Sequence, residues 1–233
     1  MHNGTSGHMI DAIILAAGRS LRMGTQKLLL PFAGQTVIGH IVDQVLAAGV
    51  RAAVVVVARD DQTVRAALTD RAVKLAENSD PAGDMLSSVR AGIRALPADN
   101  SAALIVLGDQ PSIRSGLIRL LISARQSSGT GIVTPVYGGK RGHPMLVAAR
   151  YFDELLNYHD GVGLRGLLAA HTEDLCELPV SDEGVLTDMD YPEDYQRELA
   201  RLQASQYALG QHASLFQQNS RPQRAGPLVK EIE

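Results

Sequence analysis

The sequence predicts an α/β fold in which helices cover both faces of a mostly parallel sheet. Short apolar runs of the kind that buried parallel strands show recur along the chain, at 13–15, 52–58, 72–76, 102–107, 131–135 and 175–179. Stretches with apolar residues at helical spacing separate several of these runs, and such alternation is typical of a parallel sheet. A chain of 233 residues suits one such domain, with room for a small appendage.

The first apolar run leads into a loop of small residues and cations. Its residues are Leu15, Ala16, Ala17 and Gly18, followed by Arg19, Arg22 and Lys27. Small residues after a strand let the backbone approach a ligand, and their amides can point at an anion. Arginine and lysine add the charge that suits a triphosphate. An anion-binding loop is the favoured interpretation, although a basic connecting loop would have the same composition.

Two helices and two strands are expected next. Thr36 is a suitable N-cap for a helix over 37–46, and Gly49 suits its C-terminal stop. Four consecutive valines mark the strand at 52–58, a helix is expected over 62–68, and the strand at 72–76 follows. Pro81 and Gly83 then interrupt regular structure, and a helix is expected to start at Ser87 and Ser88. Their hydroxyls can either cap the backbone or meet a ligand.

The strand at 102–107 ends in Gly-Asp-Gln-Pro, which places Asp109 at a strand end. Ligands of open α/β sheets bind at the carboxyl ends of parallel strands. Mg²⁺ prefers oxygen ligands and commonly shares one or two carboxylates with substrate phosphates. Asp109 is therefore the first candidate for a metal ligand. A turn-forming aspartate before a helix that starts near Pro111 is the alternative.

A second group of cations lies between 137 and 146, after an amphipathic helix expected over 117–124. The loop contains Lys140 and Arg141 and then Gly142, His143 and Pro144. It could face an acceptor phosphate or form a solvated hairpin tip, and composition does not separate the two. A helix is expected over 147–158, and a glycine-rich segment carrying Arg165 follows it.

The last strand at 175–179 precedes an acidic segment that contains Asp188, Asp190, Glu193 and Asp194. The two later acids are expected to begin a helix, where they favour the helix dipole. Residues 1–8 are rich in His, Gly and Ser and are interpreted as an expression leader. The domain is expected to span 9–202, with 203–233 as a mobile or partner-dependent tail.

Residues 15–34 resemble the signature LAAGxSxRMGxxKxLLPxxG of the MobA-like nucleotidyltransferases, and most closely that of the molybdenum cofactor cytidylyltransferase branch. The resemblance implies a Rossmann-like domain that uses a nucleoside triphosphate with Mg²⁺ and transfers NMP to a phosphorylated acceptor. Further similar motifs are Gly-Asp-Gln-Pro, Gly-His-Pro and the Asp188–Asp194 segment, in which Tyr191 stands where the family usually has Thr.

The resemblance assigns roles to individual residues. Lys27, Arg22 and Asp109 are expected to be catalytic, and Asp109 and Asp190 to bind the metal. The nucleotide is expected to contact Leu15, Ala16, Ala17, Gly18, Arg19, Arg22, Lys27, Ser87, Ser88 and Asp109. The acceptor is expected to contact Gly142, His143, Pro144 and Arg165, although a structural ion pair is an equal alternative for Arg165. Asp188 is expected either to contact the metal or to make structural hydrogen bonds.

The resemblance thus implies CMP transfer from CTP to the terminal phosphate of molybdopterin, with release of pyrophosphate. Ala17 and Gln110 favour CTP over GTP, because the guanylyltransferase branch tends to differ at both. Alternatives are a guanylyltransferase of the same pathway, a nucleotidyltransferase for another phosphorylated metabolite, or a non-catalytic protein that carries the cofactor to a molybdenum hydroxylase. The net charge of −3 gives no footprint for nucleic acid or an anionic membrane, and a single cysteine fits a reducing cytoplasm.

Overall fold

A computed structural model of the chain describes residues 9–18, 22–80 and 83–219, with 208–219 described by their backbone alone. The segment interpreted as a leader, residues 1–8, and Arg19 of the predicted anion-binding loop lie outside the described residues. None of the described helices combines the length and the apolar character that crossing a membrane requires.

The core of the fold is an eight-stranded sheet. Seven of its strands follow the order β10-β7-β9-β6-β1-β4-β5, and the eighth, β8, pairs with β7. Its strands are β1 (Ile10–Ala16), β4 (Ala53–Ala58), β5 (Lys74–Asn78), β6 (Ala102–Leu107), β7 (Ile132–Tyr137), β8 (Lys140–Arg141), β9 (Met145–Ala148) and β10 (Leu175–Pro179). A separate hairpin pairs β2 (Pro31–Phe32) with β3 (Gln35–Thr36). The β6–β1–β4–β5 run and the β7–β10 pair are parallel, as predicted.

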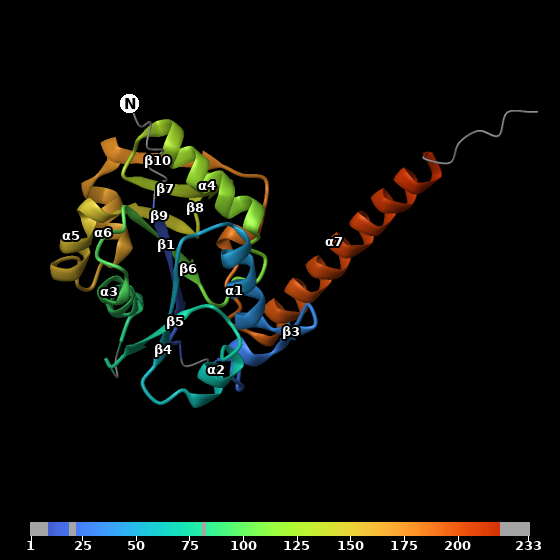
Figure 1. The fold of residues 1–233 in the computed structure, drawn as a ribbon, viewed down its shortest axis with the longest axis horizontal. Helices are drawn as coiled ribbons and strands as arrows, with labels where there is room; N and C mark the ends of the chain where they lie inside the picture. Colours follow the sequence, from blue (N-terminus) through green and yellow to red (C-terminus); the bar gives the residue numbers. More distant parts are fainter. Residues whose placement is uncertain (1–8, 19–21, 81–82, 220–233) are drawn as a thin grey trace, which may run out of the picture.

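Helices cover both faces of this sheet, which confirms the predicted α/β class (Figure 1). The helices are α1 (Val37–Ala47), α2 (Gln62–Ala67), α3 (Met85–Ala95), α4 (Ser115–Ser128), α5 (Phe152–Asn157), α6 (Leu164–Ala170) and α7 (Pro192–Asn219). Helices α1, α2 and α4 pack on one face, whereas α3, α5 and α6 pack on the other.

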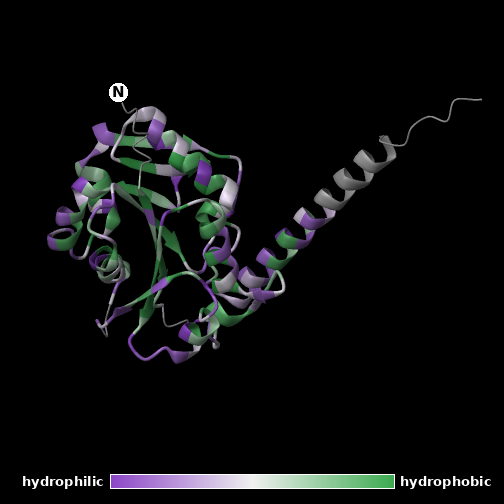
Figure 2. Cartoon of the chain, viewed as in Figure 1, coloured by the Kyte–Doolittle hydropathy of each residue, from purple (hydrophilic) through white to green (hydrophobic). Residues whose placement is uncertain are grey.

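Strand β4 shows why the sheet needs both layers. Val55 and Val57 belong to the hydrophobic cluster on the α1 side, and Val54 and Val56 belong to the cluster on the α3 side. Successive side chains of a strand point to opposite faces, so a run of four valines is buried only when both faces are covered. The strands are accordingly mostly hydrophobic, and hydrophilic residues gather on the surrounding helices and loops (Figure 2).

Helix α1 begins where the sequence predicts. The Oγ1 atom of Thr36 accepts a hydrogen bond of 3.1 Å from the backbone N–H of Gly39, which satisfies one of the first amides of the helix. Gly49, just beyond the helix, has a φ of 85°, a conformation that glycine adopts without steric cost. Thr36 and Gly49 thus set the two ends of the crossover that returns the chain to β4.

The helix predicted over 147–158 is wrong in its first half. Met145–Ala148 form β9, which is antiparallel to both β6 and β7, and α5 begins only at Phe152. All four residues of β9 are buried because the strand lies in the interior of the sheet. A short apolar run of this kind does not distinguish a buried strand from the start of a buried helix.

Other helix boundaries also differ from the prediction, and α4 extends beyond the predicted 117–124 at both ends. Helix α3 begins at Met85 with Asp84 as its N-cap, two residues before the predicted start at Ser87. Helix α7 continues across residue 202 to Asn219 and projects away from the sheet (Figure 1). Tyr195, Leu199 and Leu202 pack against the core, which anchors the first turns of α7. The division of the chain into a domain and a mobile tail stays a prediction.

Candidate active site

The ends of β1 and β6 meet in the middle of the sheet. The chain runs from β1 outward to β4 and β5 and then returns to the other side of β1 as β6. Such a reversal of strand order opens a crevice at the carboxyl ends of the strands, where open α/β sheets bind ligands. The backbone N–H of Gly108 donates to the carbonyl of Leu15 at 2.9 Å, and a Cβ on Gly108 would lie 2.5 Å from that oxygen. Glycine at 108 therefore permits the contact that brings Asp109 beside the predicted anion-binding loop.

Lys27 lies between the two aspartates predicted to bind metal. Its Nζ atom is 2.6 Å from Oδ2 of Asp109 and 3.1 Å from Oδ1 of Asp190. The lysine side chain is only 10% exposed, and this burial lowers its pKa. The two carboxylates outweigh burial and raise the pKa of Lys27 above its usual value, so the ammonium stays charged. Arg22 adds a second cation, with Nη1 2.8 Å from Oδ2 of Asp190.

Asp194 holds the segment that carries Asp190, a role that the sequence analysis missed. Its Oδ2 atom accepts backbone hydrogen bonds from Asp190 at 2.9 Å and Tyr191 at 2.7 Å. Burial raises the pKa of Asp194, but these hydrogen bonds, joined by Arg197, lower it below the usual value. The signal was an acidic residue in the first turn of a helix, which can reach back to free amides as well as favour the helix dipole.

Asp188 makes the structural hydrogen bond that was one of its two predicted roles. Nε2 of Gln110 donates to Oδ1 of Asp188 at 2.7 Å. Desolvation and repulsion from Asp109 raise the pKa of Asp188, and the hydrogen bond from Gln110 opposes that shift. Oε1 of Gln110 is buried and has no hydrogen-bond partner among the described residues. The contact between Gln110 and Asp188 links the end of β6 to the acidic segment before α7.

A cleft of about 420 Å³ opens over the loop after β1, and we call it the nucleotide cleft. It brings together most of the residues predicted to contact the nucleotide: Leu15, Ala16, Ala17, Gly18, Arg22, Lys27, Ser88 and Asp109. Asp188 and Asp190 also line it. Ser87 is not among the described residues that line the cleft. Arg19 lies outside the described residues.

Asn78 bonds both serines, yet the two serines have different surroundings. Nδ2 of Asn78 donates to Oγ of Ser87 at 2.8 Å and to Oγ of Ser88 at 2.9 Å. The hydroxyl of Ser87 donates in turn to the carbonyl of Asp84, inside the first turn of α3. Ser87 is therefore engaged in ordering the start of the helix, whereas Ser88 is presented to the nucleotide cleft.

A second cleft, of about 960 Å³, adjoins the first, and we call it the acceptor cleft. The two share Asp84, Met85, Leu107 and Asp188 among their lining residues. Three of the four residues predicted to contact the acceptor line this cleft, namely Gly142, His143 and Arg165. Pro144 is buried and is not among its described lining residues. Lys140 and Arg141 contribute further cations to the same cleft.

His143 is an uncharged group at neutral pH in this position. Desolvation lowers the pKa of its imidazole to about 4, although Asp109 favours the charged form. Its Nδ1 atom is buried and lacks a hydrogen-bond partner among the described residues. His143 can thus bind a ligand by hydrogen bonding, but it offers no positive charge to a phosphate. The neighbouring Gly142 packs so closely on Val185 that a Cβ would collide with the carbonyl oxygen of Val185.

The donor set of the nucleotide cleft suits a hard divalent cation. Asp109 and Asp190 supply carboxylate oxygens, the ligands that Mg²⁺ prefers. Both carboxylates lie within hydrogen-bond distance of one ammonium nitrogen, that of Lys27, so they converge on a single cationic centre. Among the described residues, no group of three or more His, Cys, Asp or Glu side chains is arranged to hold a metal by itself. Phosphate oxygens of a substrate would have to complete the coordination.

Comparison with known sequences gives a family match over most of the chain. The sequence model described as the MobA-like NTP transferase domain matches residues 12–175. A molybdenum cofactor cytidylyltransferase of Escherichia coli K12 is 26% identical over 186 residues, which cover 80% of this chain and 93% of that protein. A nicotine blue oxidoreductase of Paenarthrobacter nicotinovorans is 31% identical over 149 residues, covering 60% of this chain and 71% of that protein.

A solved structure supports the same fold assignment. The protein comes from Mycobacterium tuberculosis H37Rv and was crystallised as a complex with manganese. It superposes with a TM-score of 0.69 at 27% identity and covers 82% of this chain and 98% of its own. The matched region of the family model contains the loop after β1, Asp109 and the Gly-His-Pro motif, and it ends before Asp190.

Proposed function

The chain belongs to the MobA-like NTP transferase family and is a nucleotidyltransferase, and from that premise we propose that it transfers CMP from CTP to the terminal phosphate of molybdopterin. Pyrophosphate is the second product, and Mg²⁺ is the metal. The observation that carries this proposal is the position of Lys27, which pairs with Asp109 and Asp190 beside the loop after β1. That arrangement gathers the charges that a metal-bound triphosphate needs at one point of the nucleotide cleft.

The adjoining clefts support transfer between two bound substrates. An oxygen of the acceptor phosphate attacks the α-phosphorus of CTP, a new P–O bond forms, and the bond to the β-phosphate oxygen breaks. Lys27 and Arg22 stabilise the negative charge that develops on the phosphates. Mg²⁺ held by Asp109 and Asp190 would supply further positive charge to the phosphate oxygens. Because the clefts adjoin, two bound substrates would lie next to each other. Holding two reactants in the right geometry accounts for a large share of catalysis in such reactions.

No general base is needed in this reaction. A terminal phosphate is already anionic near neutral pH, so it attacks without losing a proton. His143 is neutral there and lacks a partner for Nδ1 among the described residues, which suits hydrogen bonding to the acceptor. Lys140 and Arg165 supply the positive charge that an anionic acceptor requires, whereas Arg141 is paired with Glu177 in the same cleft.

The choice of CTP rests on Ala17 and on the relatives. Ala17 lines the nucleotide cleft, where a residue can influence the bound nucleotide. Gln110, the other residue taken as evidence for CTP, lines the acceptor cleft and bonds Asp188. Its effect is therefore expected on the acceptor side. The resemblance to a molybdenum cofactor cytidylyltransferase supports both CTP and molybdopterin.

The product would serve a molybdenum hydroxylase, the partner to which a carrier protein would also deliver the cofactor. A carrier without catalysis has no use for a lysine between two carboxylates at a phosphate site, so the intact set favours an enzyme. The single cysteine, Cys176, fits a cytoplasmic location.

The proposal is tested by pyrophosphate release from purified protein. CTP, GTP, ATP and UTP are supplied in parallel with Mg²⁺, each with and without molybdopterin. Release is expected with CTP only, and only when molybdopterin is present. Release with GTP would reassign the enzyme as a guanylyltransferase. Release with a sugar 1-phosphate or methylerythritol phosphate in place of molybdopterin would reassign the acceptor, and no release with any pair would favour the carrier.

A further inference from the structure

Arg90 connects the helix of the nucleotide cleft to the loop of the acceptor cleft. It lies on α3, whose residues Met85 and Ser88 line the nucleotide cleft. Its Nε atom donates to the carbonyl of Leu155 at 2.8 Å, and Nη2 donates to the carbonyl of Tyr158 at 2.8 Å. Nη1 donates to Oδ1 of Asp160 at 2.6 Å. One guanidinium nitrogen thus bonds α5 itself, and the other two bond the segment that follows α5.

That segment leads directly into the wall of the acceptor cleft. We define residues 158–165 as the acceptor loop, because Gly161, Val162, Gly163, Leu164 and Arg165 line the cleft. His159, Gly161 and Gly163 have φ values of 72°, 74° and 68°. A histidine at positive φ is uncommon, so the surroundings have to hold the loop in this conformation.

The first part of the loop is also held by Glu154 of α5. Oε1 of Glu154 lies 2.7 Å from Nε2 of His159, and Oε2 lies 2.7 Å from Nε2 of His171, just after α6. Glu154 therefore ties the acceptor loop to the helix that follows it. Among the described residues, Arg90 is the side chain of α3 that hydrogen-bonds this loop, through contacts with its first part.

We propose that Arg90 is a positioning residue that fixes the acceptor loop, so that its loss weakens the use of the acceptor and leaves nucleotide binding unchanged. Arg90 is not among the described residues that line either cleft, so it acts through the loop. This role rests on the proposed function, because it takes the second cleft as the acceptor site. An ammonium group cannot reproduce the planar fork that reaches three acceptors in different directions.

The matched test compares Arg90→Ala and Arg90→Lys with Arg94→Ala. Arg94 is exposed, lies one turn further along α3, and has no hydrogen bond or ion pair with the described residues of the acceptor loop. For both Arg90 variants, kcat/KM for molybdopterin is expected to fall by about tenfold to a hundredfold, the cost of a small misplacement of a reactant. KM for CTP should stay within about twofold of the wild-type value, and Arg94→Ala should match the wild type in both constants. Equal rises in KM for CTP and for molybdopterin would overturn the role.

Hydrogen exchange tests the same role without an assay of transfer. In Arg90→Ala, amides of residues 158–165 should exchange faster than in the wild type, while the first turn of α3 should be unchanged. Unchanged exchange in the acceptor loop would overturn the inference. If the wild type releases no pyrophosphate with any nucleotide, the proposed function fails, and hydrogen exchange alone decides whether Arg90 fixes the loop.

Discussion

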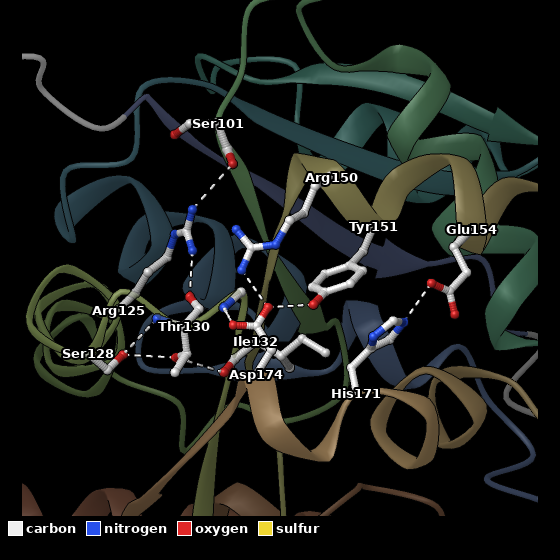
Figure 3. A network of polar contacts seen from close by, with 11 residues as sticks. Ser101, Arg125, Ser128, Thr130, Ile132, Arg150, Tyr151, Glu154, His171 and Asp174 are labelled. Carbon is white, nitrogen blue, oxygen red and sulfur yellow. Dashed lines mark hydrogen bonds and ion pairs between the residues drawn. The ribbon is translucent and has the colours of Figure 1, made fainter.

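The two ends of the central sheet both carry networks of charged side chains, yet they differ in kind. At the carboxyl ends of β1 and β6, Asp109 and Asp190 share two cations, Lys27 and Arg22, and Asp188 lines the same cleft. At the amino ends of β7 and β10, Asp174 is surrounded by donors (Figure 3). We call this second group, Gly131, Arg150, Tyr151 and Asp174, the amino-end network.

Asp174 is saturated with hydrogen bonds. It accepts from the backbone N–H of Gly131 at 2.9 Å, from Nη2 of Arg150 and from the hydroxyl of Tyr151. Burial raises its pKa, but the bonds from Tyr151 and Arg150 lower the pKa to about 2. These contacts join the starts of β7 and β10 to the helical turn that follows β9, so the amino-end network serves the fold.

At the carboxyl end, the negative side chains outnumber the positive ones. Three carboxylates face two cations, the pKa of Asp188 is raised, and the group lines an open cleft. The comparison teaches that an ion pair does not by itself mark a functional site. Surplus negative charge at a cleft is the more informative sign, because a bound cation or a cationic group can relieve it.

The largest expected effect is the loss of turnover when Lys27 is replaced. Lys27→Ala removes the buried ammonium between Asp109 and Asp190, so kcat for pyrophosphate release should fall by about a hundredfold to a thousandfold. Stopped assays with saturating CTP and molybdopterin measure this change. Arg150→Ala, which removes a cation from the amino-end network, is the matched control and should keep kcat within about twofold. Near-normal turnover in Lys27→Ala would refute the role of the lysine.

The second effect concerns the metal. Asp109→Asn and Asp190→Asn each remove one of the negative charges proposed to hold Mg²⁺, so half-maximal activity should require at least about tenfold more Mg²⁺. A titration of activity with Mg²⁺ measures the shift. Asp174→Asn carries the same chemical change at the other end of the sheet and should leave the titration unchanged. Superimposable titrations for wild type and Asp109→Asn would remove Asp109 from the metal site.

The smallest expected effect is on stability. It concerns the pH dependence of the free energy of unfolding that Asp174 contributes at the amino end of the sheet. The folded-state pKa of Asp174 lies below its value of 3.8 in the unfolded chain, so its stabilising effect is fully present above pH 3.8. That effect is lost as the pH falls toward 2. Asp174→Asn should therefore lower the free energy of unfolding at pH 7 by about 1–3 kcal/mol and flatten its fall below pH 4. Denaturant unfolding across this pH range measures both, and a variant with wild-type pH dependence would contradict the account.

Much of the fold could be predicted because it depends on local patterns. The valines of β4, the apolar run of β6 and the cap at Thr36 lie where the sequence indicated. Strand β9 could not be identified, because its four buried residues owe their conformation to pairing with β6 and β7. The pairing partners are distant in sequence, and the run itself is compatible with a helix.

The candidate site was predicted in its residues more than in its contacts. Lys27, Asp109 and Asp190 come together in the structure, as their motifs indicated. Arg90 was missed as a positioning residue because it bonds a segment distant in sequence, and Asp194 was missed because a first-turn acid was interpreted only as favouring the helix dipole. Pro144 was predicted to contact the acceptor because it belongs to the Gly-His-Pro motif. It is buried and is not among the described residues that line the cleft.

The most direct test of the central claim is thermal unfolding with Mg²⁺ and each of CTP, GTP, ATP and UTP in parallel. A ligand at about 100 times its Kd stabilises the folded state by about 2.7 kcal/mol. CTP alone is expected to raise the Tm, in the wild type and in Asp174→Asn alike, and the shift should shrink in Lys27→Ala. No shift with any nucleotide, or an undiminished shift with CTP in Lys27→Ala, would contradict a nucleotide site at the carboxyl end of the sheet.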